Sequence, residues 1–198
     1  DSVRGGVRTS FIQKFAHSVA KLVEDGKEVI VVTRGAVGTG MAILGYDEKP
    51  KVLAEKQACA AVGQIDLMYV YREMFLGNGI AVGQILLSAD DFRDRVRYKN
   101  LQNTLKTMIS KKIIPLINEN DSLVVKELNG IGDNDKLSSD VALFFDADLL
   151  VVFTDEDGLF DDNPKKNPKA RLLRFVPEIT PDIIALTGKP GENGSAVS

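Results

Sequence analysis

Four short, mostly apolar runs without polar alternation constrain the fold of this 198-residue chain more than any other feature. The runs occupy 28–33, 80–87, 113–117 and 149–153, and segments with apolar residues at helical spacing separate them. A strand that is apolar on both faces is typical of a parallel sheet covered by helices on both sides. The pattern therefore predicts an α/β fold in which 28–33 is an interior strand.

The segments between these runs are predicted to be helical, and they occupy 8–23, 51–75, 98–110 and 136–145. In the first helix, Thr9 or Ser10 is the expected N-cap and Gly26 the residue that follows the end. The second helix is rich in alanine and contains Gly63, and such small residues allow a helix to pack closely against its neighbours. Two polar residues of this helix, Gln57 and Gln64, are equally well explained as pocket residues or as solvated positions.

The composition favours a cytoplasmic protein with small-molecule chemistry. A net charge of −3 with scattered basic residues lacks the basic surface expected of a protein that binds nucleic acid or an anionic membrane. Cys59 is the single cysteine, so no internal disulfide is possible, and we expect a buried, inert thiol in a reducing compartment. No membrane span or signal peptide is predicted, and His17 has no second histidine with which to bind a metal ion.

Two clusters of carboxylates and amides follow the third apolar run. They are NEND at 118–121 and GDND at 132–135, and a third polar segment at 154–159 follows the last run. Open α/β sheets bind ligands beyond the carboxyl ends of their strands. Either cluster alone is explained by turns and helix caps, in which Asn, Asp and Gly are common. Together they favour a site that binds a substrate amino group or holds side chains near phosphates.

Three glycines at positions 35, 38 and 40 follow the first apolar run. Glycine lets the backbone approach a ligand closely, and the helix that follows offers free N–H groups to an anion. A plain strand-to-helix turn is the alternative. The spacing matches neither a Walker loop nor a dinucleotide fingerprint, and the segment is predicted to bind a carboxylate or a phosphate.

In these motifs the chain resembles the glutamate 5-kinase family of the amino acid kinase superfamily, over nearly its whole length. The residues that carry the resemblance are 35–37, 56–64, 84–87, 118–121, 132–135, 154–155 and 157–159. The Thr-Asp pair at 154–155 occurs in other kinases of the superfamily. The combination of the helix at 56–64 with NEND and GDND is far more specific.

The resemblance implies a three-layer αβα sandwich with a largely parallel central sheet. It implies one amino acid kinase domain over 1–198, with an amino-acid substrate lobe at about 1–125 and a nucleotide lobe at about 126–198. The implied reaction transfers the γ-phosphoryl group of ATP, with Mg²⁺, to the side-chain carboxylate of L-glutamate and forms γ-glutamyl phosphate, the first step of proline biosynthesis. Such a transfer needs positioning and electrostatic stabilisation rather than a protein nucleophile.

Substrate residues are carried over from the family by position. Asp121 and Asn134 are expected to bind glutamate, and the segment Arg34, Gly35 and Ala36 is expected to hold it through backbone groups. Arg34 departs from the family, which usually has serine at this position. Its guanidinium is a planar fork of donors that suits a carboxylate, so we expect direct pairing; a solvent-facing or obstructing side chain is the alternative.

Nucleotide and catalytic residues are carried over in the same way. Thr154 and Asp155 are expected to contact ATP, and Asp135 to organise catalytic lysines. Family members have a Lys-Gly-Ser-type strand before the first helix and a Gly-Gly-Met-type segment with a second lysine. This chain starts after the Lys-Gly-Ser-type strand and stops before the Gly-Gly-Met-type segment, so the resemblance implies that the sequence is incomplete.

The expected ligands are ATP, Mg²⁺ bound with ATP, and L-glutamate, with proline as a candidate feedback inhibitor. A homo-oligomer, dimer or tetramer, is expected, and neither nucleic acid nor membrane is an expected partner. Two alternatives stay open. The first alternative is a superfamily kinase with another acceptor, such as acetylglutamate or a nucleoside monophosphate. The second is an inactive protein that senses glutamate or proline.

Overall fold

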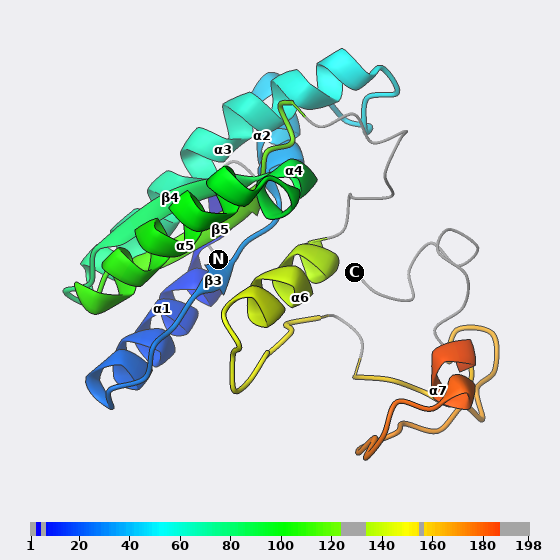
Figure 1. Ribbon diagram of the computed structural model, residues 1–198. Coiled ribbons are helices and arrows are strands. Elements are labelled where there is room, and N and C mark those ends of the chain that lie inside the picture. The colour runs from blue at the N-terminus through cyan, green and yellow to red at the C-terminus, as the bar shows by residue number, and fades with distance from the viewer. Residues whose placement is uncertain (1–2, 5–6, 124–133, 155–156, 187–198) are drawn as a thin grey trace. The chain divides into compact units, whose positions relative to one another are not determined.

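The computed structural model describes residues 3–4, 7–123, 134–154 and 157–186 (Figure 1). The chain divides into two compact units, Asp1–Leu137 and Ser138–Ser198, which are described separately below. The expected single domain with lobes at 1–125 and 126–198 stays a prediction.

A parallel sheet forms the centre of the first unit. Among the described residues it has the order β3 (Val31–Val32), β5 (Ile114–Glu119) and β4 (Val82–Leu87). All six residues of β5 are buried, as expected for a central strand without alternation. In the described part of the chain β3 pairs with β5 alone, so the prediction of an interior strand at 28–33 is wrong there. A two-stranded antiparallel ribbon of β1 (Val3–Arg4) and β2 (Val7–Arg8) precedes the first helix.

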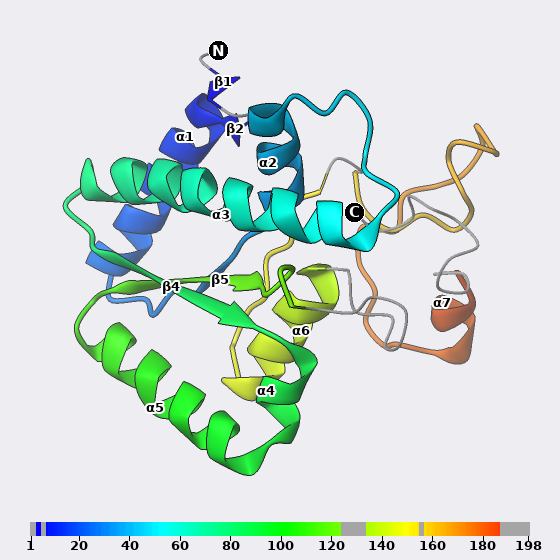
Figure 2. The same ribbon diagram turned by 90° about the horizontal axis from the view of Figure 1, so that it is seen from above.

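Helices cover both faces of this sheet, as Figure 2 shows. On one face lie α1 (Thr9–Glu24), α2 (Ala36–Leu44) and α3 (Leu53–Leu76), and on the other lie α4 (Ala89–Arg93) and α5 (Arg95–Ser110). Ala16 and Val19 of α1 join Phe75 of α3 and Leu116 of β5 in one buried apolar cluster. The α5 face buries Leu105 completely. This arrangement confirms the predicted α/β fold with three layers.

Local signals set the ends of several helices. Asp94 caps α5 and accepts hydrogen bonds from the backbone N–H groups of Val96 (2.9 Å) and Arg97 (2.8 Å). The first helix begins at Thr9, directly after β2, so Arg8 occupies the N-cap position and the predicted caps Thr9 and Ser10 lie inside the first turn. That prediction was wrong because the preceding strand continues to Arg8.

The glycines at 38 and 40 lie within α2, because this helix already begins at Ala36. Gly38 lines a cavity beside the start of this helix, and binding of a carboxylate or a phosphate by this segment stays a prediction. A Cβ atom at Gly40 would overlap the carbonyl group of Cys59, and one at Gly63 would overlap the backbone of Ala36 and Gly40. Gly40 and Gly63 therefore let α2 and α3 pack backbone against backbone, which confirms the close packing expected of α3. Cys59 is fully buried in this contact, as predicted.

The second unit differs most from the prediction. Helix α6 (Asn134–Phe144) spans the boundary between the units, and α7 (Pro181–Leu186) lies near the end of the described chain. The predicted strand at 149–153 is absent from the described structure, and its side chains are exposed, with Leu149 at 76% and Phe153 at 63%. A strand needs a neighbouring strand for its N–H and C=O groups, and none of the described strands pairs with 149–153. None of the helices described is both long and apolar enough to cross a membrane.

Candidate functional site

The three parallel strands end at the same edge of the sheet in the first unit, and polar residues follow each end. Thr33 and Arg34 follow β3, Ser88 follows β4, and Asn120 follows β5. The backbone N–H of Asn120 donates to the carbonyl oxygen of Leu87 (2.8 Å), which holds the ends of β4 and β5 together. This edge is where open α/β folds bind ligands.

A cavity of about 280 Å³ opens at this edge between α3 and the ends of β4 and β5. We call it the carboxyl-edge pocket. Its polar lining residues are Gln64, Gln84, Glu119, Asn120, Asp121 and Ser122, and Ala36 and two alanines of α3 are among the others. The hydroxyl of Ser122 donates to the side-chain oxygen of Asn120 (2.8 Å), which orders the turn that carries Asp121. Two predicted substrate residues, Ala36 and Asp121, therefore line one pocket.

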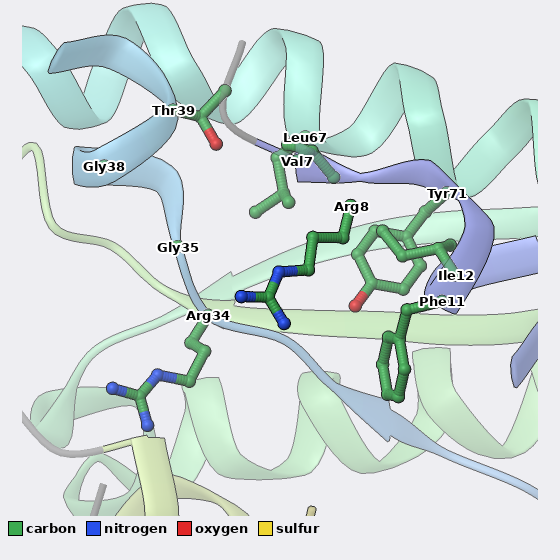
Figure 3. Close-up of a pocket in the computed structure, with 10 residues that line it drawn as sticks. All are labelled: Val7, Arg8, Phe11, Ile12, Arg34, Gly35, Gly38, Thr39, Leu67 and Tyr71. Atoms are coloured by element: carbon green, nitrogen blue, oxygen red, sulfur yellow. The ribbon is translucent and has the colours of Figure 1, made fainter. Parts of the chain in front are cut away.

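A second cavity of about 380 Å³ lies beside the start of α2, and we call it the arginine pocket (Figure 3). Arg8, Phe11, Arg34, Gly35 and Tyr71 are among the residues that line it. In Figure 3 the side chain of Arg34 extends away from that of Arg8, and Arg34 is exposed. Burial raises the pKa of Tyr71 to about 12, so its hydroxyl stays protonated at neutral pH. The predicted residues Arg34 and Gly35 line this pocket rather than the carboxyl-edge pocket.

Gly35 joins β3 to α2 in a conformation that favours glycine. Its φ angle is 109°, in the left-handed range, and it occupies the N-cap position of α2. The carbonyl oxygen of Gly35 accepts a hydrogen bond from the backbone N–H of Thr39 (2.9 Å), which is the first bond of the helix. The N–H groups of the α2 residues before Thr39 have no acceptor within the helix. The helix start therefore offers N–H groups to an anion, and binding of a carboxylate or a phosphate there stays a prediction.

Asn134 is tied to the ends of β3 and β5 by a series of side-chain amides. Its nitrogen donates to the backbone oxygen of Thr33 and to the side-chain oxygen of Asn118 (2.8 Å). The Asn118 nitrogen donates to Gln64 Oε1 (2.8 Å), and the Gln64 nitrogen donates to Gln84 Oε1 (3.1 Å). The sequence left Gln64 open between a pocket residue and a solvated position, and it lines the carboxyl-edge pocket. Its link to Asn118 was missed, since no sequence signal connects positions so far apart. We call this series the amide chain.

The remaining predicted residues are less completely placed. Asp135 is partly buried in the first turn of α6, directly after Asn134. Thr154 is exposed and belongs to the second unit, and Asp155 lies outside the described residues, as does position 133 of the GDND cluster. The nucleotide contacts of Thr154 and Asp155 and the catalytic role of Asp135 stay predictions. Within the described ranges, no group of three or more His, Cys, Asp or Glu side chains is placed to hold a metal ion.

Comparison with known proteins gives one family. The model of the amino acid kinase family matches residues 2–193. The chain is 44% identical over 190 residues to "Glutamate 5-kinase 2" of Bacillus subtilis, covering 96% of this chain and 51% of that protein. It is 48% identical over 182 residues to "Glutamate 5-kinase" of Methanosarcina barkeri, covering 91% of this chain and 48% of that protein. For the protein of the same name from Methanococcoides burtonii, the identity is 46% over 187 residues, 94% of this chain and 50% of that protein. The chain thus spans about half the length of the curated relatives that it matches.

Proposed function

Because this chain belongs to the amino acid kinase family, as the match over residues 2–193 shows, we propose that its protein phosphorylates the side-chain carboxylate of L-glutamate with ATP. An oxygen of that carboxylate attacks the γ-phosphorus of ATP. The bond from this phosphorus to the β,γ-bridging oxygen breaks, and γ-glutamyl phosphate and ADP are formed. The attacking carboxylate is already ionised at neutral pH, so the transfer needs no general base.

The observation that carries this proposal is the carboxyl-edge pocket in a chain similar to proteins named glutamate 5-kinase. Its volume of about 280 Å³ suits a single amino acid, and it places Asp121 at the ends of the parallel strands. Asp121 accepts hydrogen bonds from the substrate ammonium group. Asn134, held by the amide chain, is the second residue that binds the amino acid.

The segment that starts α2 holds a carboxylate of the substrate in this proposal. Gly35 and Ala36 contribute backbone N–H groups, and their place at the N-terminus of α2 supports this role. Arg34 adds a charged hydrogen bond if its side chain turns from its exposed position towards the ligand. Positioning of this kind supplies a large part of the rate enhancement in phosphoryl transfer.

Asp135, Thr154 and Asp155 serve the nucleotide side of the reaction in this proposal. Asp135 holds cationic side chains against the transferring phosphoryl group, and Thr154 and Asp155 contact ATP. Mg²⁺ supplies charge stabilisation when bound, and in phosphoryl-transfer sites it is commonly held by substrate phosphates, waters and one or two carboxylates. Such a metal ion needs no cluster of three protein carboxylates, and none is found among the described residues.

The biological setting is part of the same proposal. The product is the activated intermediate of proline biosynthesis, and proline is the expected feedback inhibitor. We propose a homo-oligomer that works in the cytoplasm, and the single buried cysteine is consistent with a reducing compartment.

The decisive experiment traps the product chemically in the whole protein. Acyl phosphates react with hydroxylamine to give hydroxamates, whereas phosphate esters do not, so ATP-dependent hydroxamate formation from L-glutamate identifies the acceptor group. N-acetyl-L-glutamate and a nucleoside monophosphate are tested alongside, with ADP release as a second readout. We expect ADP release with L-glutamate at least about a hundredfold faster than with either alternative, accompanied by hydroxamate formation with L-glutamate.

Two results would contradict this proposal. Faster turnover of another acceptor would identify a different kinase of the same family. Binding of glutamate or proline in calorimetry, without ADP release or hydroxamate, would identify a sensing protein.

A further inference from the structure

The amide chain runs in one direction through the first unit. Each of its three side-chain hydrogen bonds is donated by an amide nitrogen and accepted by the oxygen of the next side chain. The order of donation is Asn134, Asn118, Gln64 and Gln84. A primary amide has one oxygen and one NH₂ group, so turning any single amide over would place oxygen against oxygen or NH₂ against NH₂.

Two backbone groups fix this direction. The carbonyl oxygen of Thr33 only accepts, so the nitrogen of Asn134 must face it. The backbone N–H of Glu119 only donates, and it lies 2.9 Å from Asn118 Oδ1, so this oxygen must accept. Asn118 then points its nitrogen at Gln64, which must accept through Oε1. The orientation of the whole chain thus follows from groups whose roles in hydrogen bonds cannot be exchanged.

The consequence for Asn134 is that both of its N–H groups donate inside the protein, to Thr33 and to Asn118. Only its oxygen is then offered to a ligand. A ligand group that meets this oxygen must be a donor, such as an ammonium group, whereas a carboxylate would be repelled.

Burial makes the middle of the chain sensitive to Gln64. Asn118 is 1% exposed and Gln64 is 9% exposed, so water does not readily replace a lost partner. Gln64 lies on α3, while Asn118 lies on β5. Without the oxygen of Gln64, the Asn118 nitrogen is left without this acceptor, and its amide is free to move away from Asn134.

We propose that Gln64 is a positioning residue that acts through Asn118 to hold the Asn134 oxygen towards the ammonium group of the substrate. This inference rests on the proposed function for the identity of the substrate and for its contact with Asn134, whereas the amide geometry itself does not. It predicts that the amide of Gln64 on α3 affects substrate specificity at Asn134, the first residue of α6. It also gives a chemical rule for the site: an amino acid is accepted, and its analogue without the amino group is rejected.

The test compares three variants of the whole protein. Gln64→Met keeps length and helix propensity but removes the acceptor for Asn118. Gln64→Glu restores an acceptor oxygen, and its protonated form also restores the donor to Gln84. Gln13→Met is the matched control, because Gln13 is an exposed glutamine on α1.

We expect Gln64→Met to raise the glutamate KM about tenfold with less than a threefold fall in kcat and little change in the ATP KM. The preference for glutamate over glutarate, which lacks the ammonium group, should fall by a similar factor in competition binding. Gln64→Glu should recover most of the loss, and more fully as the pH is lowered and its carboxyl is protonated. Gln13→Met should match the wild type.

A readout without substrate separates this inference from the proposed function. In proton–nitrogen spectra of the ligand-free protein, the side-chain NH₂ signals of Asn118 and Asn134 should exchange slowly with water in the wild type and faster in Gln64→Met. If they exchange equally in both proteins, the inference is wrong even when the glutamate KM rises, because Gln64 then contacts the substrate directly. If the signals respond as expected but L-glutamate is not phosphorylated, the proposed function fails and the positioning role stands. An unchanged KM and glutarate preference in an active Gln64→Met protein would overturn the inference.

Discussion

Gly63→Ala is the substitution whose effect follows most directly from the backbone packing of α2 on α3. The added methyl group would overlap the carbonyl oxygen of Ala36 and the backbone nitrogen of Gly40, and it would lie 2.9 Å from the Cα atom of Gly40. All three obstructing atoms belong to backbone, so no side-chain rotation relieves the overlap. The two helices must separate.

The expected change in the free energy of unfolding is the difference between two opposing effects. Replacing glycine by alanine inside a helix stabilises it by about 1 kcal/mol. Overpacking of a tight core contact costs about 1–3 kcal/mol, and an overlap with rigid backbone belongs at the upper end of this range. We therefore expect Gly63→Ala to lower the free energy of unfolding by about 2 kcal/mol, which corresponds to a fall in Tm of about 4–8 °C.

Gly38→Ala is the matched control on α2. A Cβ atom at Gly38 meets nothing within 4 Å, so only the gain in helix propensity remains, and stability should rise by up to about 1 kcal/mol. Urea unfolding followed by circular dichroism measures both variants. The opposite signs are the test: a Gly63→Ala protein as stable as the wild type would show that α2 and α3 separate freely, and the packing argument would be wrong. Since Ala36 also lines the carboxyl-edge pocket, Gly63→Ala should raise the glutamate KM as well.

Four further predictions concern single charged residues. Asp135→Asn should lower kcat by about a hundredfold or more with little change in glutamate affinity, because it removes electrostatic preorganisation; retention of most of kcat would refute this role. Asp121→Ala should weaken glutamate binding by about 1–3 kcal/mol in calorimetry, and an equal loss of ATP affinity would indicate a collapsed turn instead. Arg34→Ser should raise the glutamate KM about tenfold, near 1.4 kcal/mol, whereas an unchanged KM indicates a solvent-facing side chain and a lower KM indicates obstruction. The pKa of Asp161 lies below its usual range, because the backbone N–H and then the guanidinium of Arg171 donate to it. A lowered pKa stabilises the fold above the unfolded-state pKa, and this contribution is lost as the pH falls through the folded-state pKa. Arg171→Leu keeps the backbone donor, so a carboxyl-carbon NMR titration should find the Asp161 pKa raised part of the way, and an unchanged pKa would contradict the assigned cause.

Periodic patterns in the sequence determined most of the first unit. The unalternated runs at 80–87 and 113–117 correspond to β4 and β5, and the helical spacing predicted α1, α3 and α5 to within a few residues. Such patterns succeed because burial on both faces of a strand, or along one stripe of a helix, selects residue types locally. The position of the polar clusters at strand ends likewise indicated the sheet edge where the carboxyl-edge pocket lies.

Local patterns misled where the outcome depended on neighbours in space. The run at 149–153 has the composition of a buried strand, but in the described structure it has no strand beside it. The glycine at position 40 pointed to ligand binding, and only the structure shows that the backbone of Cys59 lies against it. The roles of Asp135, Thr154 and Asp155 were taken from a family resemblance and stay predictions.

Sequence alone determined that this chain forms helices packed on a parallel sheet, with carboxylates and amides beyond the strand ends, because those properties depend on residues close together in the chain. Only the tertiary structure decided which of these polar groups meet. Asn134, Asn118, Gln64 and Gln84 lie on different elements, and their order of donation follows from the backbone groups of Thr33 and Glu119. Hydrogen bonds between distant residues depend on distances of a few ångströms and on direction, and neither is encoded in composition, spacing or periodicity.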